Sequence, residues 1–134
     1  MHVLITCTDR RQDPFRYLLP ESDQQLTFVG GAYHLNQSFH QFLSAIQTLQ
    51  EVTGRKVTQV SLVNHLHCMR AQYILGRPAD ITDHSSVLKQ VGDYIRLRYP
   101  NVTVDKFLLD EDRATLIEMN GQPLRRSLRP PAIV

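Results

Sequence analysis

The sequence predicts one α/β domain built on a mostly parallel β-sheet flanked by helices. Short apolar runs alternate with amphipathic segments of helical length, the order expected when crossover helices join parallel strands. The last two apolar runs are separated only by Asp110 to Arg113, so we expect an antiparallel hairpin strand at the C-terminal side of the sheet. The chain of 134 residues fits a single domain, placed at 1–124 and followed by a C-terminal tail at 125–134.

The expected strands are short runs of β-type composition that end in polar or glycine residues. They are His2 to Cys7, Leu26 to Val29, Val57 to Val63, Val102 to Leu109 and Ala114 to Met119. The first run is apolar and typical of a strand buried in the sheet, with Cys7 at its carboxyl end. The second stops at Gly30-Gly31, where the backbone is free to turn sharply.

The expected helices carry apolar residues at the spacing of one helical face. They are Ser38 to Val52, Met69 to Leu75 and Ser85 to Tyr99. Gly54, Gly76 and Pro100 follow them as stops. The segment from Thr8 to Pro20 has the character of an irregular connection.

The amino-acid composition is that of a globular protein and gives no indication of a nucleic-acid or membrane partner. The hydrophobic fraction is 42% and the charged fraction 21%, which is ordinary for a globular protein. A formal net charge of +2 is too small to indicate nucleic acid, and we interpret Arg125, Arg126 and Arg129 as part of a solvated tail. Neither a signal peptide nor a membrane span begins at Met1, so we expect a cytoplasmic protein without a membrane partner.

Cys7 ends the first predicted strand, and Cys68 follows the third. In open sheets of this kind ligands sit beyond the carboxyl ends of the strands, where strand order reverses, and Cys7, His65 and Cys68 fall there. Two thiols and an imidazole are a ligand set that zinc prefers, with a fourth position left for an exchangeable group. Two alternatives stay open: each cysteine is simply a buried hydrophobic residue, or Cys7 and Cys68 form a redox pair with no metal between them.

Two motifs resemble those of the β-class carbonic anhydrases. Cys7, Asp9 and Arg11 form a Cys-x-Asp-x-Arg motif at the end of the first strand, and His65 and Cys68 form a His-x-x-Cys motif at the end of the third. By this resemblance Cys7, His65 and Cys68 hold zinc, and zinc-bound hydroxide converts carbon dioxide to bicarbonate. Arg11 would orient the Asp9 carboxylate, and in a closed form Asp9 itself would be the fourth ligand.

The resemblance extends over most of the chain. Asp13-Pro14, Phe28-Val29 and the closing hairpin follow the family's order. It implies a small-molecule partner, carbon dioxide or bicarbonate, and leaves a homodimer or a higher homo-oligomer open. Asn64 and Met69 stand where the family commonly has glycine, so Met69 raises the question whether its position needs a positive φ.

The stretch Gly30-Gly31-Ala32-Tyr33 departs from the family's Arg-Asn-Ala-Gly-like sequence. Only the backbone amides of Gly30 and Gly31 are left there as candidate substrate contacts. Two further functions therefore stay open. One is a zinc-binding protein without hydratase activity, with a structural or regulatory role. The other is a lyase or hydrolase that acts on a different small carbonyl-type substrate.

Overall fold

The framework of the fold is one mixed β-sheet with strand order β2-β1-β3-β4-β5-β6. The computed structural model describes residues 1–8 and 22–127. The strands are β1 His2–Cys7, β2 Gln24–Phe28, β3 Gln59–His65, β4 Thr103–Asp110, β5 Thr115–Glu118 and β6 Leu124–Ser127. The first four strands pair in parallel, and β5 and β6 continue the sheet in antiparallel pairs. The predicted fold class is confirmed.

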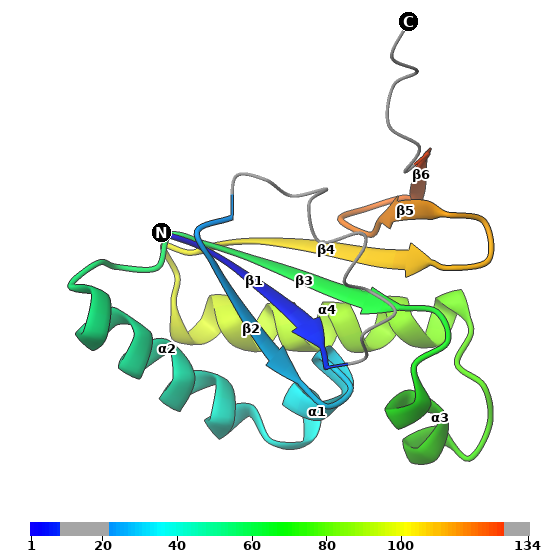
Figure 1. Cartoon of the computed structure of the whole chain (residues 1–134), viewed down its shortest axis with the longest axis horizontal. Coiled ribbons are helices and arrows are strands. Elements are labelled where there is room, and N and C mark those ends of the chain that lie inside the picture. The colour runs from blue at the N-terminus through cyan, green and yellow to red at the C-terminus, as the bar shows by residue number, and fades with distance from the viewer. Residues whose placement is uncertain (9–21, 128–134) are drawn as a thin grey trace, which may run out of the picture.

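The helices of the described residues lie on one side of this sheet (Figure 1). They are α1 Ala32–Gln37, α2 Phe39–Thr53, α3 Met69–Leu75 and α4 Ile81–Arg98. Gly54 and Gly76 end α2 and α3 in the left-handed conformation, with φ of 66° and 71°, as the sequence predicted for helix stops. Within the described ranges, no helix is both long and apolar enough to cross a membrane.

Both faces of the central strands are buried. On β1, Val3, Ile5 and Cys7 belong to the large core cluster that includes the helices, whereas Leu4 belongs to a second cluster. The other members of this second cluster are Val63, Phe107, Leu109 and Leu116. Because successive side chains of a strand point to opposite faces, the apolar run of β1 serves both clusters.

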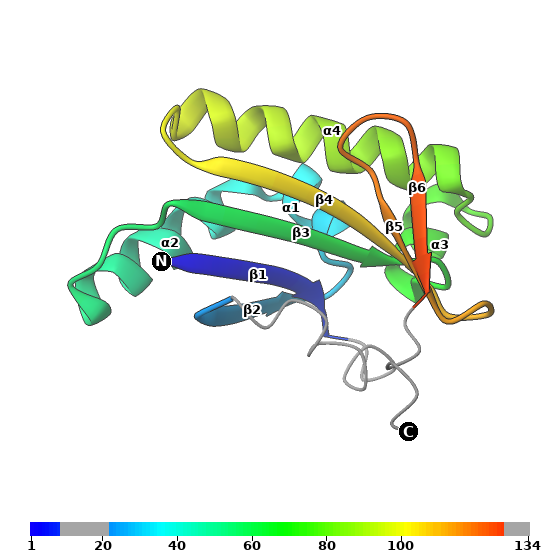
Figure 2. The same cartoon turned by 90° about the horizontal axis from the view of Figure 1, so that it is seen from above.

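The chain crosses from one side of β1 to the other. It leaves β1 for β2 and later returns through α1 and α2 to β3, which pairs with β1 on the opposite edge. Figure 2 shows β1 between these two neighbours. The strand order therefore reverses between β1 and β3, whose carboxyl ends lie together, with Thr6 opposite Val63.

Two helices differ from the sequence prediction. Helix α1 was not predicted, because Ala32–Gln37 is one short segment directly after the glycine pair. Helix α4 begins at Ile81 rather than Ser85, because Asp80 caps it in a reciprocal capping box with Asp83.

Three strands also differ. Strand β3 spans Gln59–His65 rather than Val57 to Val63, so His65 is its last residue. Strand β2 spans Gln24–Phe28 rather than Leu26 to Val29. Strand β6 occupies Leu124–Ser127, so the expectation of a tail without regular structure after Leu124 is wrong for residues 125–127. This segment is ordered by its pairing with β5 and by an ion pair between Arg125 and Asp110. A short polar run of sequence predicts neither contact. Arg129 lies outside the described residues.

Candidate metal centre

Cys7, His65 and Cys68 converge at the carboxyl ends of β1 and β3. Cys7 is the last residue of β1, His65 is the last residue of β3, and Cys68 immediately precedes α3. One candidate ligand atom from each residue lies within 4.8 Å of the other two, and all three residues are buried. Two sulfurs and one imidazole nitrogen match a zinc centre with three protein ligands. The residues present therefore fit this metal.

The thiol of Cys7 lies against the backbone of the glycine turn. The Gly30 N–H donates to Cys7 Sγ across 3.3 Å. Gly30 has φ of 97°, and a Cβ built there would lie 2.5 Å from Cγ of Arg70. Only glycine combines this conformation with so close an approach to α3. The glycine turn thus directs an amide hydrogen at a sulfur that would be a metal ligand.

Cys68 is placed by the start of α3. Its backbone is extended, with φ −72° and ψ 116°, and the Gln72 N–H closes the first helical turn on its carbonyl oxygen at 3.1 Å. The Cys7 side chain, followed by burial, raises the pKa of the Cys68 thiol, and backbone hydrogen bonds from Ala71 and Arg70 oppose this shift. Metal binding would therefore have to release a proton from this thiol.

Met69 and Asn64 have ordinary backbone conformations. Among the described residues, Ala114 is the non-glycine residue with a positive φ, at 47°. The turn between β3 and α3 therefore accommodates Asn64 before His65 and Met69 after Cys68 without left-handed strain.

His65 is oriented by a carboxylate that lies just beyond the neighbouring strand β4. Its Nδ1 lies 2.8 Å from Oε1 of Glu111, and the imidazole is completely buried. Burial lowers the pKa of His65, but the hydrogen bond with Cys7 and the charge of Glu111 outweigh it, so the net shift is upward. With Nδ1 engaged by Glu111, Nε2 is the ring nitrogen that would ligate a metal.

A second buried histidine supports the chain on either side of His65. His84 Nδ1 lies 3.2 Å from Nδ2 of Asn64, and its Nε2 lies 3.3 Å from the Leu66 carbonyl. Oδ1 of Asn64 accepts the Ala32 N–H at 3.2 Å. These bonds tie the end of β3 to α1 and α4.

The structure brings together the three predicted ligands and Gly30. The Gly31 N–H donates to the Phe28 carbonyl at 2.9 Å, so it closes the turn after β2. Substrate contacts of Gly30 and Gly31 stay a prediction. Asp9 and Arg11 lie outside the described residues, as do Asp13 and Pro14.

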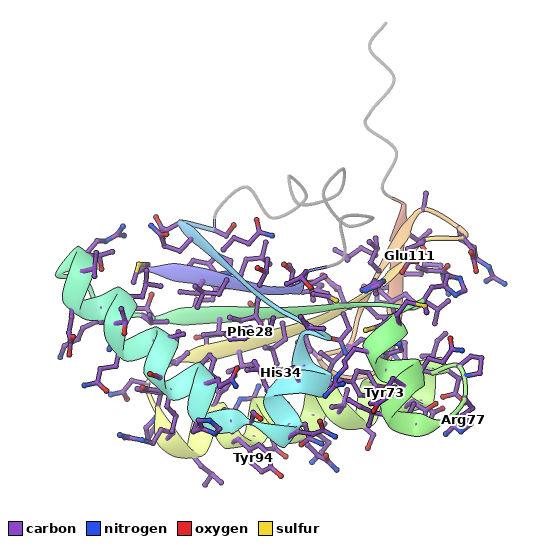
Figure 3. The ribbon with its side chains drawn as sticks, turned by 60° about the horizontal axis from the view of Figure 1, so that its bottom comes forward. Phe28, His34, Tyr73, Arg77, Tyr94 and Glu111 are labelled. Atoms are coloured by element: carbon purple, nitrogen blue, oxygen red, sulfur yellow. The ribbon has the colours of Figure 1, made fainter. Side chains whose placement is uncertain are left out.

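Glu111 and His84 were missed by the sequence analysis. Glu111 lies one residue beyond β4, in a segment interpreted only as a hairpin connection. The sequence could have indicated Glu111, because it follows a strand that is parallel to β3. The carboxyl ends of neighbouring parallel strands share one edge of the sheet. Glu111 is labelled at this edge in Figure 3. The contact of His84 with Asn64 could not be predicted, because no local sequence pattern links the two residues.

A pocket of about 250 Å³ opens beside Cys68. It is lined by Leu66, His67, Cys68, Met69, Gln72, Pro78 and Ala79. Its lining combines apolar side chains with the polar side chains of His67 and Gln72, and its size suits a small molecule. A larger groove of about 530 Å³ lies between β2 and α2 and contains none of the candidate ligands.

No family model and no curated protein matches the sequence. Among solved structures, the chain is similar to a carbonic anhydrase from Glaciozyma antarctica, with a TM-score of 0.60 and 16% sequence identity. The similarity covers 88% of this chain and 80% of that one. The chain has a carbonic-anhydrase-like fold. Within this carbonic-anhydrase-like fold, the described residues bring Cys7, His65 and Cys68 together as a group that could hold a metal ion.

Proposed function

We propose that this chain is a zinc enzyme of the β-class carbonic anhydrase type, which interconverts carbon dioxide and bicarbonate. The observation that carries the proposal is the convergence of Cys7, His65 and Cys68 within 4.8 Å at the point where strand order reverses. The fold similarity to a carbonic anhydrase supports it independently of these residues. The two motifs that carry the ligands add a third line of support.

Cys7, His65 and Cys68 would hold the metal. A zinc ion at such a site supplies Lewis acidity, which brings the pKa of a coordinated water near 7. The Gly30 N–H would stabilise the Cys7 thiolate through the 3.3 Å contact to its sulfur. His65 would be held with Nδ1 on Glu111, so that its ring cannot rotate away from the cysteines.

Asp9 and Arg11 would move and orient the proton. They follow Cys7 by two and four residues. We propose that Arg11 holds the Asp9 carboxylate as a hydrogen-bond acceptor beside the reacting water, so that the nucleophile faces carbon dioxide. In a closed form Asp9 would instead be the fourth ligand. The carbon dioxide molecule would approach through the pocket beside Cys68.

One observation favours a second candidate, a zinc protein without hydratase activity. The segment that carries polar pocket residues in the family consists here of Gly30, Gly31, Ala32 and Tyr33. Ala32 and Tyr33 are buried, with 1% and 5% of their surface exposed, and belong to the core. This stretch therefore contributes packing, and a structural or regulatory zinc protein would need nothing more from it.

Stopped-flow measurement with a pH indicator tests the proposed reaction. Zinc-loaded protein is expected to accelerate carbon dioxide hydration above buffer, with a rate that rises between about pH 6.5 and 9. The matched variants are Asp9→Asn and Arg11→Met, which are expected to retain zinc and lose at least about tenfold in kcat/KM. A zinc-loaded protein with no hydration at any pH in this range would establish the second candidate.

A further inference from the structure

The carboxylate of Glu111 contacts the ring of His65, at the end of β3, and the backbone of His67, in the turn that follows. Its Oε1 lies 2.8 Å from Nδ1 of His65 and accepts the backbone N–H of His67 at 3.2 Å. A carboxylate only accepts hydrogen bonds, so Nδ1 of His65 must carry the hydrogen. The lone pair of the ring is then on Nε2, the nitrogen that would ligate the metal.

Burial makes this contact strong and selective. The His65 side chain is 0% exposed and that of Glu111 is 12% exposed. A charged hydrogen bond in such surroundings is stronger than one in water, and it disfavours any ring rotation that would break it. The neighbouring carboxylate, Asp112, makes a 2.7 Å contact with the exposed ring of His67 instead.

The position of Glu111 is itself fixed by the sheet. His65 pairs with Leu109 in the register of β3 and β4, and the Leu66 N–H donates to the Leu109 carbonyl at 2.8 Å. Beyond β4, Oδ1 of Asp110 accepts the N–H groups of Asp112 and Arg113 at 3.1 and 3.3 Å. The turn that contains Glu111 is thus held by hydrogen bonds at both ends.

We infer that Glu111 is the positioning residue of the metal centre. It selects the His65 tautomer that presents Nε2 to the metal, and it fixes the His65–Cys68 segment through the backbone of His67. The inference rests on the metal ligands of the proposed function and does not depend on the hydration reaction. Outer carboxylates of this kind typically contribute about 10- to 100-fold to metal affinity.

Zinc affinity tests the inference, measured by competition with a chromophoric chelator. The variants to compare are Glu111→Ala, Glu111→Gln and Asp112→Asn. Glu111→Ala is expected to weaken zinc binding about 10- to 100-fold. Glu111→Gln keeps an acceptor oxygen but loses the charge, so it should fall between Glu111→Ala and the wild type. Asp112→Asn removes the adjacent exposed carboxylate and should stay within about threefold of the wild type.

The His65 tautomer provides a readout other than affinity. In the metal-free protein, at a pH where the His65 ring is neutral, ¹⁵N NMR should place its hydrogen on Nδ1 in the wild type and show a mixture of tautomers in Glu111→Ala. An unchanged tautomer, or an unchanged zinc affinity in a folded Glu111→Gln protein, would overturn the inference. Failure of the wild type to bind zinc would instead contradict the proposed function.

Discussion

Nδ2 of Asn64 lies 3.2 Å from Nδ1 of His84, and both side chains are buried. The amide nitrogen of Asn64 is a donor, so Nδ1 of His84 must be the acceptor, and Nε2 carries the hydrogen that faces the Leu66 carbonyl. The ring is therefore neutral in the folded protein. A second proton on Nδ1 would oppose the amide hydrogens of Asn64 inside the core.

Replacing His84 with glutamine is expected to make the free energy of unfolding fall less steeply as the pH drops. Burial lowers the pKa of His84 from 6.5 to about 4. Between these values the unfolded chain binds a proton that the folded protein does not. Stability from this source is complete above about pH 6.5 and falls by about 3 kcal/mol as the pH drops to about 4.

Urea unfolding at several pH values measures this effect. His84→Gln should be less stable than the wild type at pH 7, yet lose less stability on acidification. The control is His40→Gln, because His40 is exposed on α2 and should leave the pH profile of the wild type unchanged. Equal slopes for wild type and His84→Gln would show that His84 does not titrate as described.

Substituting Gly30 is expected to destabilise the fold. Gly30→Ala would force a side chain into φ of 97° and place Cβ 2.5 Å from Cγ of Arg70. We expect a loss of about 1–3 kcal/mol in the free energy of unfolding, measured with urea. Gly121→Ala is the control, since no atom lies within 4 Å of a Cβ built at that position. The double variant Gly30→Ala/Arg70→Ala should recover part of the loss. Equal stability of Gly30→Ala and Gly121→Ala would refute this account.

Removing Arg125 is expected to loosen the end of the sheet. Its guanidinium lies 2.6 Å from Oδ2 of Asp110, whose side chain is 5% exposed. Burial raises the pKa of Asp110, but the hydrogen bond from Arg125 and backbone N–H groups outweigh it, so the net shift is downward. Arg125→Met leaves this carboxylate without its cation and should cost about 1–2 kcal/mol in the free energy of unfolding.

The control for Arg125→Met is Arg113→Met, because Arg113 is an exposed arginine of the turn between β4 and β5. Hydrogen exchange should show faster amide exchange in β5 and β6 for Arg125→Met but not for Arg113→Met. Identical exchange in both variants would mean that the ion pair does not hold β6.

Metal removal is expected to lower the thermal stability of the wild type. Zinc that binds only the folded chain adds about 4 kcal/mol when its free concentration is a thousand times Kd. A strong chelator should therefore lower the Tm of the wild type by more than it lowers that of Cys68→Ser. A Tm that is insensitive to the chelator in a zinc-loaded wild type would contradict this expectation.

The candidate ligands could be found from the sequence because each lies at or just beyond the end of a recognisable strand. The apolar run of β1 ends at Cys7, and β3 ends at His65, shortly before Cys68. Parallel strands bring such ends to one edge of the sheet. Local pattern and topology therefore placed these residues at one edge of the sheet, and the resemblance of the two motifs to those of the β-class carbonic anhydrases singled them out as ligands.

The supporting contacts could not be found in this way, because they depend on pairings between distant segments. Glu111 contacts His65 across 46 positions of the sequence, and His84 contacts Asn64 across 20. Strand β6 was missed because its polar residues give no strand pattern, and its order comes from pairing with β5. Helix α1 is only 6 residues long, too short for its apolar residues to reveal a period.

X-ray absorption at the zinc edge tests most directly whether Cys7, His65 and Cys68 hold one zinc ion. The protein should be purified under reducing conditions, with its zinc content measured per chain. We expect one zinc ion with two sulfur ligands at about 2.3 Å and nitrogen or oxygen ligands at about 2.0–2.1 Å. In Cys68→Ser, one sulfur or the zinc itself should be lost. A folded wild-type protein that binds no zinc, or binds zinc without sulfur ligands, would contradict the account.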